Sequence, residues 1–416
     1  MLSVAEASAA ILAGIAPLGT ERVPLLDSLG RVLAEQIISP LTLPAWDNSA
    51  MDGYAVRGAD VESASDGTAV MLRVIESVAA GAFPAKPLEP GAATRIMTGA
   101  PLPKGCDTVI RVEDTDGGLE RVTIRNARDV GKNVRRRGED IRAGDQVLER
   151  GAAIHAAQIG VLASVGAGTV DVFRRPRVAF LGSGDELVEL DRFDEALAGR
   201  KIVSSNSYTL HAMIRAAGGQ PVNLGVARDD PADLRARFES GAGNDLLITS
   251  AGISVGEFDY VRDVLVSLGA EMKFWKVRMR PGAPLGFGTI GGMPWIGLPG
   301  NPVSTMVTFE LFVRPVIRRM LGQQRLFRRA VDVVLEEPVT IGARLMHFLR
   351  AIVTPRSDGT LGARLTGPQG SGILMSMTLA NALLVVPEDR QRIEAGDTLH
   401  AILLGDDAQL ATDFSL

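Results

Sequence analysis

Residues 177–187 read RVAFLGSGDEL, and this stretch together with its surroundings decides the fold. An apolar run closed by glycines predicts a buried strand that ends in a turn. Helix-like and strand-like runs then alternate along the chain, as in DPADLRARFESG, where Asp230 is a suitable N-cap and Pro231 a suitable first helical residue. This alternation predicts a parallel, doubly wound sheet with crossover helices. We therefore predict an α/β domain over residues 176–327.

The segments on either side of this domain predict three further domains. Residues 45–145 alternate short β-like runs with Gly and Pro turns, which is typical of a β-rich domain inserted into its neighbour. Residues 1–44 and 146–175 carry helix-like apolar spacing and predict an N-terminal helical and linker domain around that insert. Residues 328–416 are strand-like again and suggest a small terminal β-barrel or sandwich, of which we adopt the barrel.

Composition excludes several classes of protein. The 416 residues carry a net charge of −5 and no long basic run, which argues against a nucleic-acid partner. The single cysteine, Cys106, excludes an internal disulfide, and the four scattered histidines offer no obvious zinc site. No run reaches the roughly 20 apolar residues of a membrane-spanning helix, and the N-terminus lacks the basic start of a signal peptide. We expect a cytoplasmic protein without a membrane partner.

Three predicted strands of the α/β domain are followed by glycines and small polar residues. In an open parallel sheet, ligands bind beyond the carboxyl ends of the strands. Backbone N–H groups at glycines and helix starts favour phosphate-like oxyanions, and nearby carboxylates suit a hard cation such as Mg²⁺. The residues are Asp185 and Glu186 in GSGDEL, Ser250, Gly252, Ser254 and Asp259 in SAGISVGEFDY, and Asn301 and Ser304 in GLPGNPVS.

Each of these three loop sequences can also be explained by a purely structural role. A strand followed by a glycine turn is commonly only a turn, and Asn301 before a proline fits simple helix-entry chemistry. GISVG matches the hydrolase pattern GxSxG, but a nucleophile elbow requires the helix to start right after the serine, and VGEFDY intervenes. No P-loop occurs, and GSGDEL lacks the third glycine of the dinucleotide fingerprint. We therefore do not predict a nucleophilic Ser254.

Basic residues near these loops are candidate partners for an anion. KVRMRPGAP contributes Lys276 and Arg280 before a Pro-Gly turn, and Lys201 precedes IVSSNSY. Taken alone, the basic strand fits a solvated face, and Lys201 fits a surface position. Beside three loops suited to oxyanions, the strand becomes a candidate anion clamp.

The β-rich insert carries a second set of polar residues. PAWDNSAMDGYAV, residues 44–56, concentrates carboxylates, an amide and a hydroxyl on a turn, which neither a helix face nor a strand face explains. RIMTGAPLP and RRRGEDI add a threonine and an acidic pair, although the arginines also fit a solvated face neutralised by its neighbours. The residues are Asp47, Asn48, Ser49, Asp52, Thr98, Glu139 and Asp140.

Seven motifs in this order resemble a known family. They are PAWDNSAMDGYAV, RIMTGAPLPKGCDTVIRVED, RRRGEDI, GSGDEL, SAGISVGEFDY, RPGAPLGFG and LPGNPVSTMVTFELFVRP. The chain resembles the molybdopterin molybdenumtransferases, the MoeA-type enzymes related to the gephyrin E domain. The resemblance covers nearly the whole chain, including QGSGILMSMTLANALLVVPE near its end.

The resemblance implies an activity and an assembly. Such enzymes insert molybdenum from molybdate into adenylylated molybdopterin and release AMP, in a reaction that depends on a divalent cation, usually Mg²⁺. An elongated homodimer is also implied, with a cleft between the α/β domain of one subunit and the β-rich insert of the other. Implied partners are a molybdopterin-adenylyltransferase and apo-molybdoenzymes or their chaperones.

Motif matching carries over the family's site residues, whose expected role is electrostatic positioning rather than covalent catalysis. The predicted catalytic residues are Asp52, Asp140, Glu186 and Asp259, of which Glu186 and Asp259 are also the predicted metal ligands. Asp230 competes with Asp229 for a place in the site. The predicted substrate-binding residues are Asn48, Ser49, Thr98, Asp185, Lys201, Asn206, Asp229, Ser250, Gly252, Ser254, Lys276, Arg280, Pro299, Asn301, Pro302 and Ser304.

Two turns depart from the family's usual pattern. RPGAP replaces the usual KPGKP, so Arg280 keeps one cation and Ala283 removes the other. SAG, with Ala251, replaces the commoner SGG, which is a mild steric change.

Two other functions compete with this one. A scaffold protein that holds molybdopterin without turnover need not keep Asp52, Asp140, Glu186 and Asp259. An enzyme of the preceding adenylylation step would comprise little more than the α/β unit, so the insert and the terminal β domain argue against it.

Overall fold

The chain is organised in two compact units. The computed structural model describes residues 1–65, 67–251 and 260–405. The first unit comprises residues 1–34, 151–155 and 169 onward, and the second comprises residues 35–150 and 156–168. These units are larger than the domains expected from sequence, because the predicted α/β and terminal β domains share the first unit.

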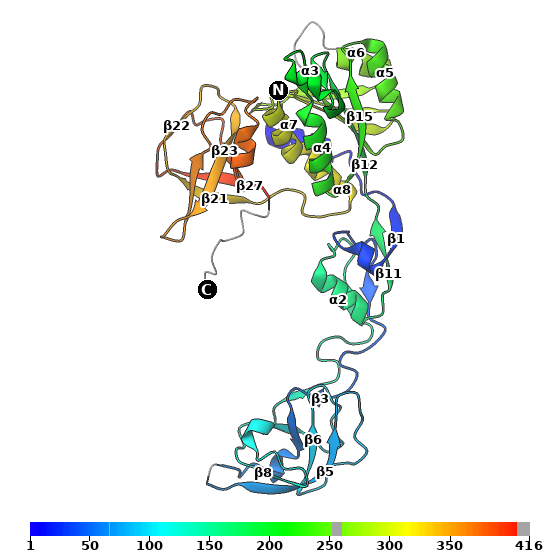
Figure 1. Ribbon diagram of the computed structural model, residues 1–416, viewed down its shortest axis with the longest axis vertical. Helices are drawn as coiled ribbons and strands as arrows, with labels where there is room; N and C mark the ends of the chain where they lie inside the picture. The colour runs from blue at the N-terminus through cyan, green and yellow to red at the C-terminus, as the bar shows by residue number, and fades with distance from the viewer. Residues whose placement is uncertain (66, 252–259, 406–416) are drawn as a thin grey trace. The chain divides into compact units, whose positions relative to one another are not determined.

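A six-stranded sheet forms the centre of the first unit (Figure 1). In spatial order its strands are β15 (Gln220–Ala227), β12 (Arg177–Ser183), β16 (Leu246–Ser250), β20 (Met293–Leu298), β19 (Pro284–Ile290) and β17 (Glu271–Lys276). The first four are parallel, as predicted, whereas β19 is antiparallel to both of its neighbours. Only Gly291 and Gly292 join β19 to β20, both with positive φ, and such a two-residue turn makes a hairpin.

Helices cover both faces of this sheet, which confirms the doubly wound architecture. Side chains of β12 alternate between two cores, with Val178 and Phe180 on one face and Ala179 and Leu181 on the other. The first face packs against α1 (Val4–Leu12), α4 (Ser205–Ala216), α7 (Pro302–Thr308) and α8 (Arg314–Met320), and the second against α5 (Pro231–Ser240) and α6 (Tyr260–Ser267).

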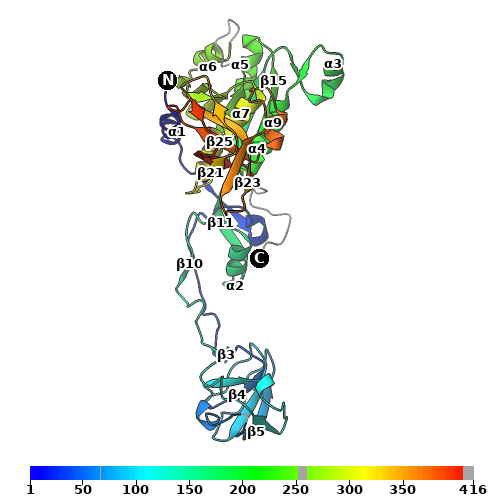
Figure 2. The same cartoon turned by 90° about the vertical axis from the view of Figure 1, so that its left-hand side faces the viewer.

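Five strands close into a barrel at the carboxyl-terminal end of the first unit, as predicted (Figure 2). They are β21 (Ala330–Leu335), β23 (Met346–Pro355), β24 (Leu361–Leu365), β25 (Ala382–Val386) and β27 (Thr398–Leu403). A sixth strand, β18 (Met279–Arg280), pairs in parallel with β23. Phe348 and Leu383 of the barrel share the first core with the sheet, so barrel and sheet pack together.

Short elements complete the first unit. The paired strands are β1 (Thr20–Pro24) with β11 (Thr169–Phe173), β13 (Leu187–Val188) with β14 (Ile202–Val203), and β22 (Val339–Thr340) with β26 (Arg392–Ile393). Further helical segments of the described part of this unit are α3 (Phe193–Leu197), α9 (Met375–Leu379), a π-helical segment, Phe309–Val313, between α7 and α8, and two short 3-10 helices, Leu25–Ser28 and Leu190–Arg192.

The second unit is β-rich, as predicted for the insert. Its main sheet has the order β7 (Thr108–Arg111), β4 (Gly53–Val56), β6 (Ala92–Ile96), β5 (Val70–Val78) and β8 (Arg121–Ile124). Its other elements are β2 (Ile37–Ile38) with β10 (Gln146–Leu148), β3 (Asn48–Ser49) with β9 (Val134–Arg135), and α2 (Ala156–Ser164). Tyr54 and Ile110 are fully buried in a core of this unit's own.

None of the helices in the described part of the chain is both long enough and apolar enough to span a bilayer.

Candidate oxyanion-binding site

A cavity of about 990 Å³ lies in the first unit, where the sheet meets the barrel. Gly182, Ser250 and Pro299 place it at the carboxyl ends of β12, β16 and β20, the position expected for ligands of an open sheet. Leu349 and Arg350 of β23 line it from the barrel side. Among the predicted site residues, the cavity wall includes Glu186, Asn206, Ser250, Arg280, Pro299, Asn301, Pro302 and Ser304.

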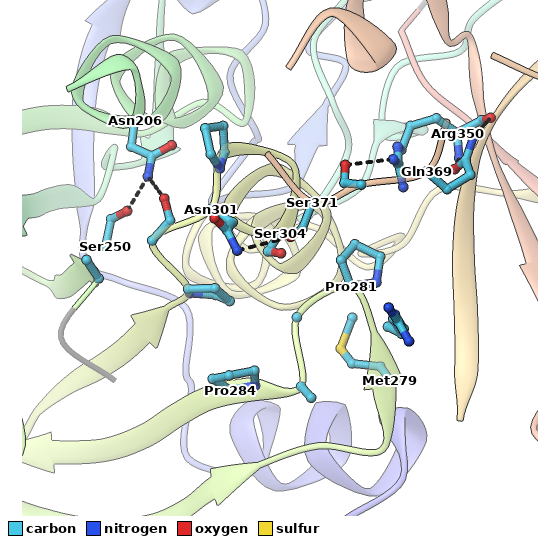
Figure 3. Close-up of a pocket in the computed structure, with 18 of the residues that line it drawn as sticks. Asn206, Ser250, Met279, Pro281, Pro284, Asn301, Ser304, Arg350, Gln369 and Ser371 are labelled. Carbon is cyan, nitrogen blue, oxygen red and sulfur yellow. Dashed lines mark hydrogen bonds between the residues drawn. The ribbon is translucent and has the colours of Figure 1, made fainter. Parts of the chain in front are cut away.

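Asn206 ties the sheet side of the cavity together. It lies in the first turn of α4, and its Nδ2 donates to Ser250 Oγ at 2.7 Å and to the Gly300 carbonyl oxygen at 2.8 Å (Figure 3). The amide thereby joins the carboxyl end of β16 and the loop that follows β20 to the start of α4.

Asn301 joins the sheet side to the barrel side. It occupies the N-cap position of α7 but its side chain caps no helix N–H. Its Nδ2 donates instead to Ser371 Oγ at 3.0 Å (Figure 3). The Val303 amide donates to the Ser371 carbonyl oxygen at 3.1 Å. The positions of Asn301 and Pro302 at the start of α7 agree with the helix-entry interpretation. The side chain of Asn301 does not cap the helix, however, because its amide group bonds to Ser371 instead.

Arg350 is a cavity residue that the sequence analysis did not predict. Its side chain is completely buried. Nη2 donates to the Gly370 carbonyl oxygen at 3.0 Å (Figure 3). Nε donates to Ser376 Oγ at 3.0 Å, whereas Nη1 has no partner among the described residues. Burial lowers the pKa of the guanidinium, and no carboxylate in the described part of the chain pairs with it. An arginine inside the apolar run FLRAIV was the available signal.

Arg280 and His347 lie side by side at the same wall, as register partners of β18 and β23. His347 is almost fully buried, and its Nδ1 lies 2.7 Å from the Leu345 carbonyl oxygen. Burial, and next the positive charge of Arg280, hold the pKa of His347 below its usual value. This wall of the cavity is therefore rich in cationic and donor groups, which suits an oxyanion.

Carboxylates gather at the edge of the cavity. The Asp185 amide lies 3.4 Å from Asp229 Oδ2, and the Asp229 amide donates to Asp185 Oδ1 at 3.2 Å. Lys201 Nζ donates to the Asp185 carbonyl oxygen. Partial burial, followed by the charges of Asp185 and Glu186, raises the pKa of Asp229. Asp230 is instead the N-cap of α5, so Asp229 rather than Asp230 belongs to this acidic edge.

The carboxylates of Asp185, Glu186 and Asp229, which we call the acidic edge, are oxygen donors of the kind that Mg²⁺ prefers. Within the described ranges, no group of three or more His, Cys, Asp or Glu residues is arranged as a complete metal site. Mg²⁺ commonly takes one or two carboxylates together with waters and substrate phosphates, so a complete protein cage is not required. Burial is the main cause of the raised pKa of Asp229, and the negative charges of Asp185 and Glu186 add to it. A divalent cation would offset this repulsion between the carboxylates.

The second unit brings two of its predicted residues into direct contact. One Asp52 oxygen accepts hydrogen bonds from the Thr98 amide and hydroxyl, both at 2.7 Å, and these bonds lower the pKa of Asp52. Asn48 and Ser49 form β3, opposite β9, and are buried. Asp140 is exposed, and its amide donates to the Leu43 carbonyl oxygen.

The remaining predicted residues fall into two groups. Gly252, Ser254 and Asp259 lie outside the described residues. Of the described ones in the first unit, Asp185, Lys201, Asp229 and Lys276 are not part of the cavity wall, and their roles stay predictions.

The fold and the cavity together define a class: a multidomain α/β protein with a candidate oxyanion-binding cavity where its sheet meets its barrel. Family models match three regions: the MoeA N-terminal region (domain I and II) at residues 2–166, a probable molybdopterin binding domain at 179–319, and the MoeA C-terminal region (domain IV) at 332–404. The chain belongs to the MoeA-type molybdopterin molybdenumtransferase family, a family of enzymes of molybdenum cofactor biosynthesis.

Individual relatives agree with this assignment. Molybdopterin molybdenumtransferase 2 of Mycobacterium tuberculosis is 39% identical over 91% of this chain and 93% of its own length. Molybdopterin molybdenumtransferase of Nostoc is 38% identical over 91% of this chain and 87% of its own. The crystal structure of the molybdopterin biosynthesis MoeA protein from Pyrococcus horikoshii is similar with a TM-score of 0.83 and 28% identity, over 97% of this chain and all of that one.

Proposed function

We propose that this chain inserts molybdenum from molybdate into adenylylated molybdopterin and releases AMP, with Mg²⁺ as the cation and a homodimer as the working form. The reaction takes place in the cytoplasm. One observation carries the proposal: Arg350, which lines the cavity together with Arg280, has a buried guanidinium with one unpartnered nitrogen and no carboxylate partner in the described part of the chain. A buried cation without a carboxylate calls for an anionic ligand.

The chain's own groups act by binding and orientation. Arg350 and Arg280 hold the tetrahedral dianion through charge-assisted hydrogen bonds. Asn206 and Asn301 fix the loops that shape the wall around it. Fixed donors in a site with little water stabilise charge strongly, because they need no reorganisation during the reaction.

The acidic edge acts on the other substrate. Asp185, Glu186 and Asp229 are the described residues that would hold Mg²⁺, whose bound form supplies positive charge for the phosphates of the adenylylated pterin. Asp259 joins them as a predicted ligand outside the described residues.

A direct assay tests the proposed reaction. The purified protein is incubated with adenylylated molybdopterin, molybdate and Mg²⁺, and AMP is measured together with the ability of the product to activate an apo-molybdoenzyme. We expect both to appear. Ligand binding without AMP release would indicate a scaffold instead, and consumption of ATP with free molybdopterin would indicate the adenylylation step.

Arg350→Met tests the observation that carries the proposal. Losing the charge-assisted hydrogen bonds of one guanidinium corresponds to about 1.5–3 kcal/mol, so we expect the affinity for molybdate to fall roughly 10- to 100-fold. The fold should persist, because the substitution removes a buried charge whose desolvation is costly and leaves no carboxylate without its partner. Titration calorimetry with molybdate measures the affinity. Arg364→Met, at an exposed arginine of neighbouring β24, is the matched control, and equal affinities of the two variants would contradict the role of Arg350.

A further inference from the structure

His347 lines the oxyanion cavity, yet neither the motifs nor the acidic edge assigns it a role. Its side chain is 4% exposed. In the barrel, β23 places it between Arg280 of β18 and Val386 of β25, its two register partners. A buried histidine at the wall of a ligand cavity has one ring nitrogen available for the ligand if the other is bound to the protein.

The hydrogen bond of His347 fixes which nitrogen is available. Nδ1 lies 2.7 Å from the Leu345 carbonyl oxygen, which can only accept, so Nδ1 carries the hydrogen. The neutral ring then presents Nε2 as an acceptor. An acceptor is unsuited to an oxyanion, whereas the protonated ring would offer a second N–H donor.

The charges around His347 explain why the ring is neutral in the free protein. The charged residues of the cavity wall besides His347 are Arg280, Arg350 and Glu186. Strand β25, which packs against β23, reads ALLVV and contributes no charge. Burial and the neighbouring Arg280 therefore oppose protonation. A bound dianion would reverse that balance, because it offsets the charge of the arginine and attracts the proton.

We propose that His347 is a further oxyanion-binding residue of this cavity, and that its Nε2 takes up a proton when a tetrahedral dianion binds beside Arg280. The inference rests on the proposed function only in its choice of molybdate as the anion. In the complex, the bound anion would contact the imidazolium of His347 and the guanidinium of Arg280, which lie side by side.

The sign of the pH dependence follows from this linkage. His347 binds its proton more tightly in the complex than in the free protein, so the affinity for the anion rises as the pH falls through the pKa of the complex. The affinity becomes constant below the pKa of the free protein. Between these limits it changes by up to about tenfold per pH unit.

Calorimetric titration with molybdate tests the proposal. Binding is measured between about pH 6 and 8, the range in which histidine titrates, in buffers of different ionisation enthalpy. The dependence of the observed enthalpy on that of the buffer gives the number of protons taken up. We expect the wild-type protein to take up a fraction of a proton, approaching about one per site. His347→Asn keeps a donor for the Leu345 carbonyl oxygen but cannot titrate, so its uptake should be zero and its affinity independent of pH.

Two further comparisons separate the possible failures. His211→Asn, at an exposed histidine of α4, should keep the wild-type uptake. Molybdate binding without proton uptake in the wild type, or uptake that persists in His347→Asn, would overturn the role of His347 and leave the proposed function standing. Absence of molybdate binding would overturn the oxyanion site and this inference with it. Absence of proton uptake in the wild type would overturn the proposal even if the substitution lowers stability.

Discussion

Ala251 has a backbone conformation that favours glycine. Its φ is +80°, in the left-handed region, where a Cβ atom costs about 1–2 kcal/mol. The residue follows β16 at the cavity wall, and it stands where the family commonly has glycine. We expect Ala251→Gly to raise the free energy of unfolding by about 0.5–1 kcal/mol, a gain reduced by the greater freedom of glycine in the unfolded chain. Urea unfolding monitored by fluorescence measures the change.

Gly300 provides the control for this prediction. A Cβ added at Gly300 would lie 3.0 Å from the Cβ of Ala251, so Gly300→Ala should be destabilising. In the Ala251→Gly background the close contact is gone, and the same substitution should cost less. Equal costs in the two backgrounds would show that the Ala251 side chain does not crowd this wall.

Asp229 makes the stability of the protein depend on pH. Its pKa is raised in the folded state, so the folded protein binds more protons than the unfolded chain, and stability falls as the pH rises through the folded-state pKa. Asp229→Asn removes the repelled charge. We therefore expect the variant to be more stable than the wild type at neutral pH, with the advantage disappearing below about pH 4, the ordinary pKa of aspartate. Urea unfolding at several pH values tests this, with Asp389→Asn as a matched exposed control.

Stabilisation by Mg²⁺ provides a second test with the wild type and the Asp229→Asn variant. If the acidic edge holds the cation, Mg²⁺ should stabilise the wild type more than Asp229→Asn. Equal stabilisation of both proteins would remove Asp229 from the proposed metal site.

At the scale of single residues, the sequence predicted site residues that lie within recognisable motifs. It missed residues that enter the cavity wall only through contacts between distant parts of the chain. Asn206 and Ser250 were predicted, and a hydrogen bond joins them. Arg350 was missed because nothing beside it in the sequence is polar; its importance comes from burial against a cavity that the sheet completes. The bond between Asn301 and Ser371, 70 positions apart, was equally out of reach for a local pattern.

At the start of helix α5, Asp230 has a structural role, whereas the neighbouring Asp229 is assigned to the acidic edge. Asp230 caps the helix by accepting a hydrogen bond from the Asp233 amide at 2.9 Å. We expect Asp230→Ala to lower the free energy of unfolding by about 1 kcal/mol and to leave AMP release unchanged below the melting transition. Asp230→Asn, which keeps a capping oxygen, should restore most of the stability. If the Asp230→Ala variant were fully folded but released less AMP, Asp230 would have a role in the site.

Elements were predicted best where local signals were strong. The Asp-Pro start of α5 agrees with its N-cap and Pro at the first turn. The antiparallel direction of β19 was missed, although the Gly-Gly pair at 291–292 is a hairpin signal. β19 follows β17 and β18 with no helix between them, so the alternation of helices and strands, on which the prediction of a parallel sheet rests, does not extend to it.

The two compact units have separate hydrophobic cores, and this has a thermodynamic consequence for the whole molecule. Multidomain chains commonly unfold in more than one transition, so we expect calorimetry to resolve two. Ile110 is fully buried in the second unit and Leu247 in the first. Replacing either by alanine removes buried methyl groups and should cost about 2–5 kcal/mol. Each substitution should lower one transition only.

Molybdate then identifies the transition that carries the site. A ligand stabilises the folded state that binds it, by an amount that grows with ligand concentration. Because Arg280 and Arg350 belong to the first unit, molybdate should raise the transition that Leu247→Ala lowers and leave the one that Ile110→Ala lowers in place. A single transition that both substitutions and the anion displace would mean that the units unfold together. A shift confined to the transition of the second unit would contradict the location of the oxyanion site.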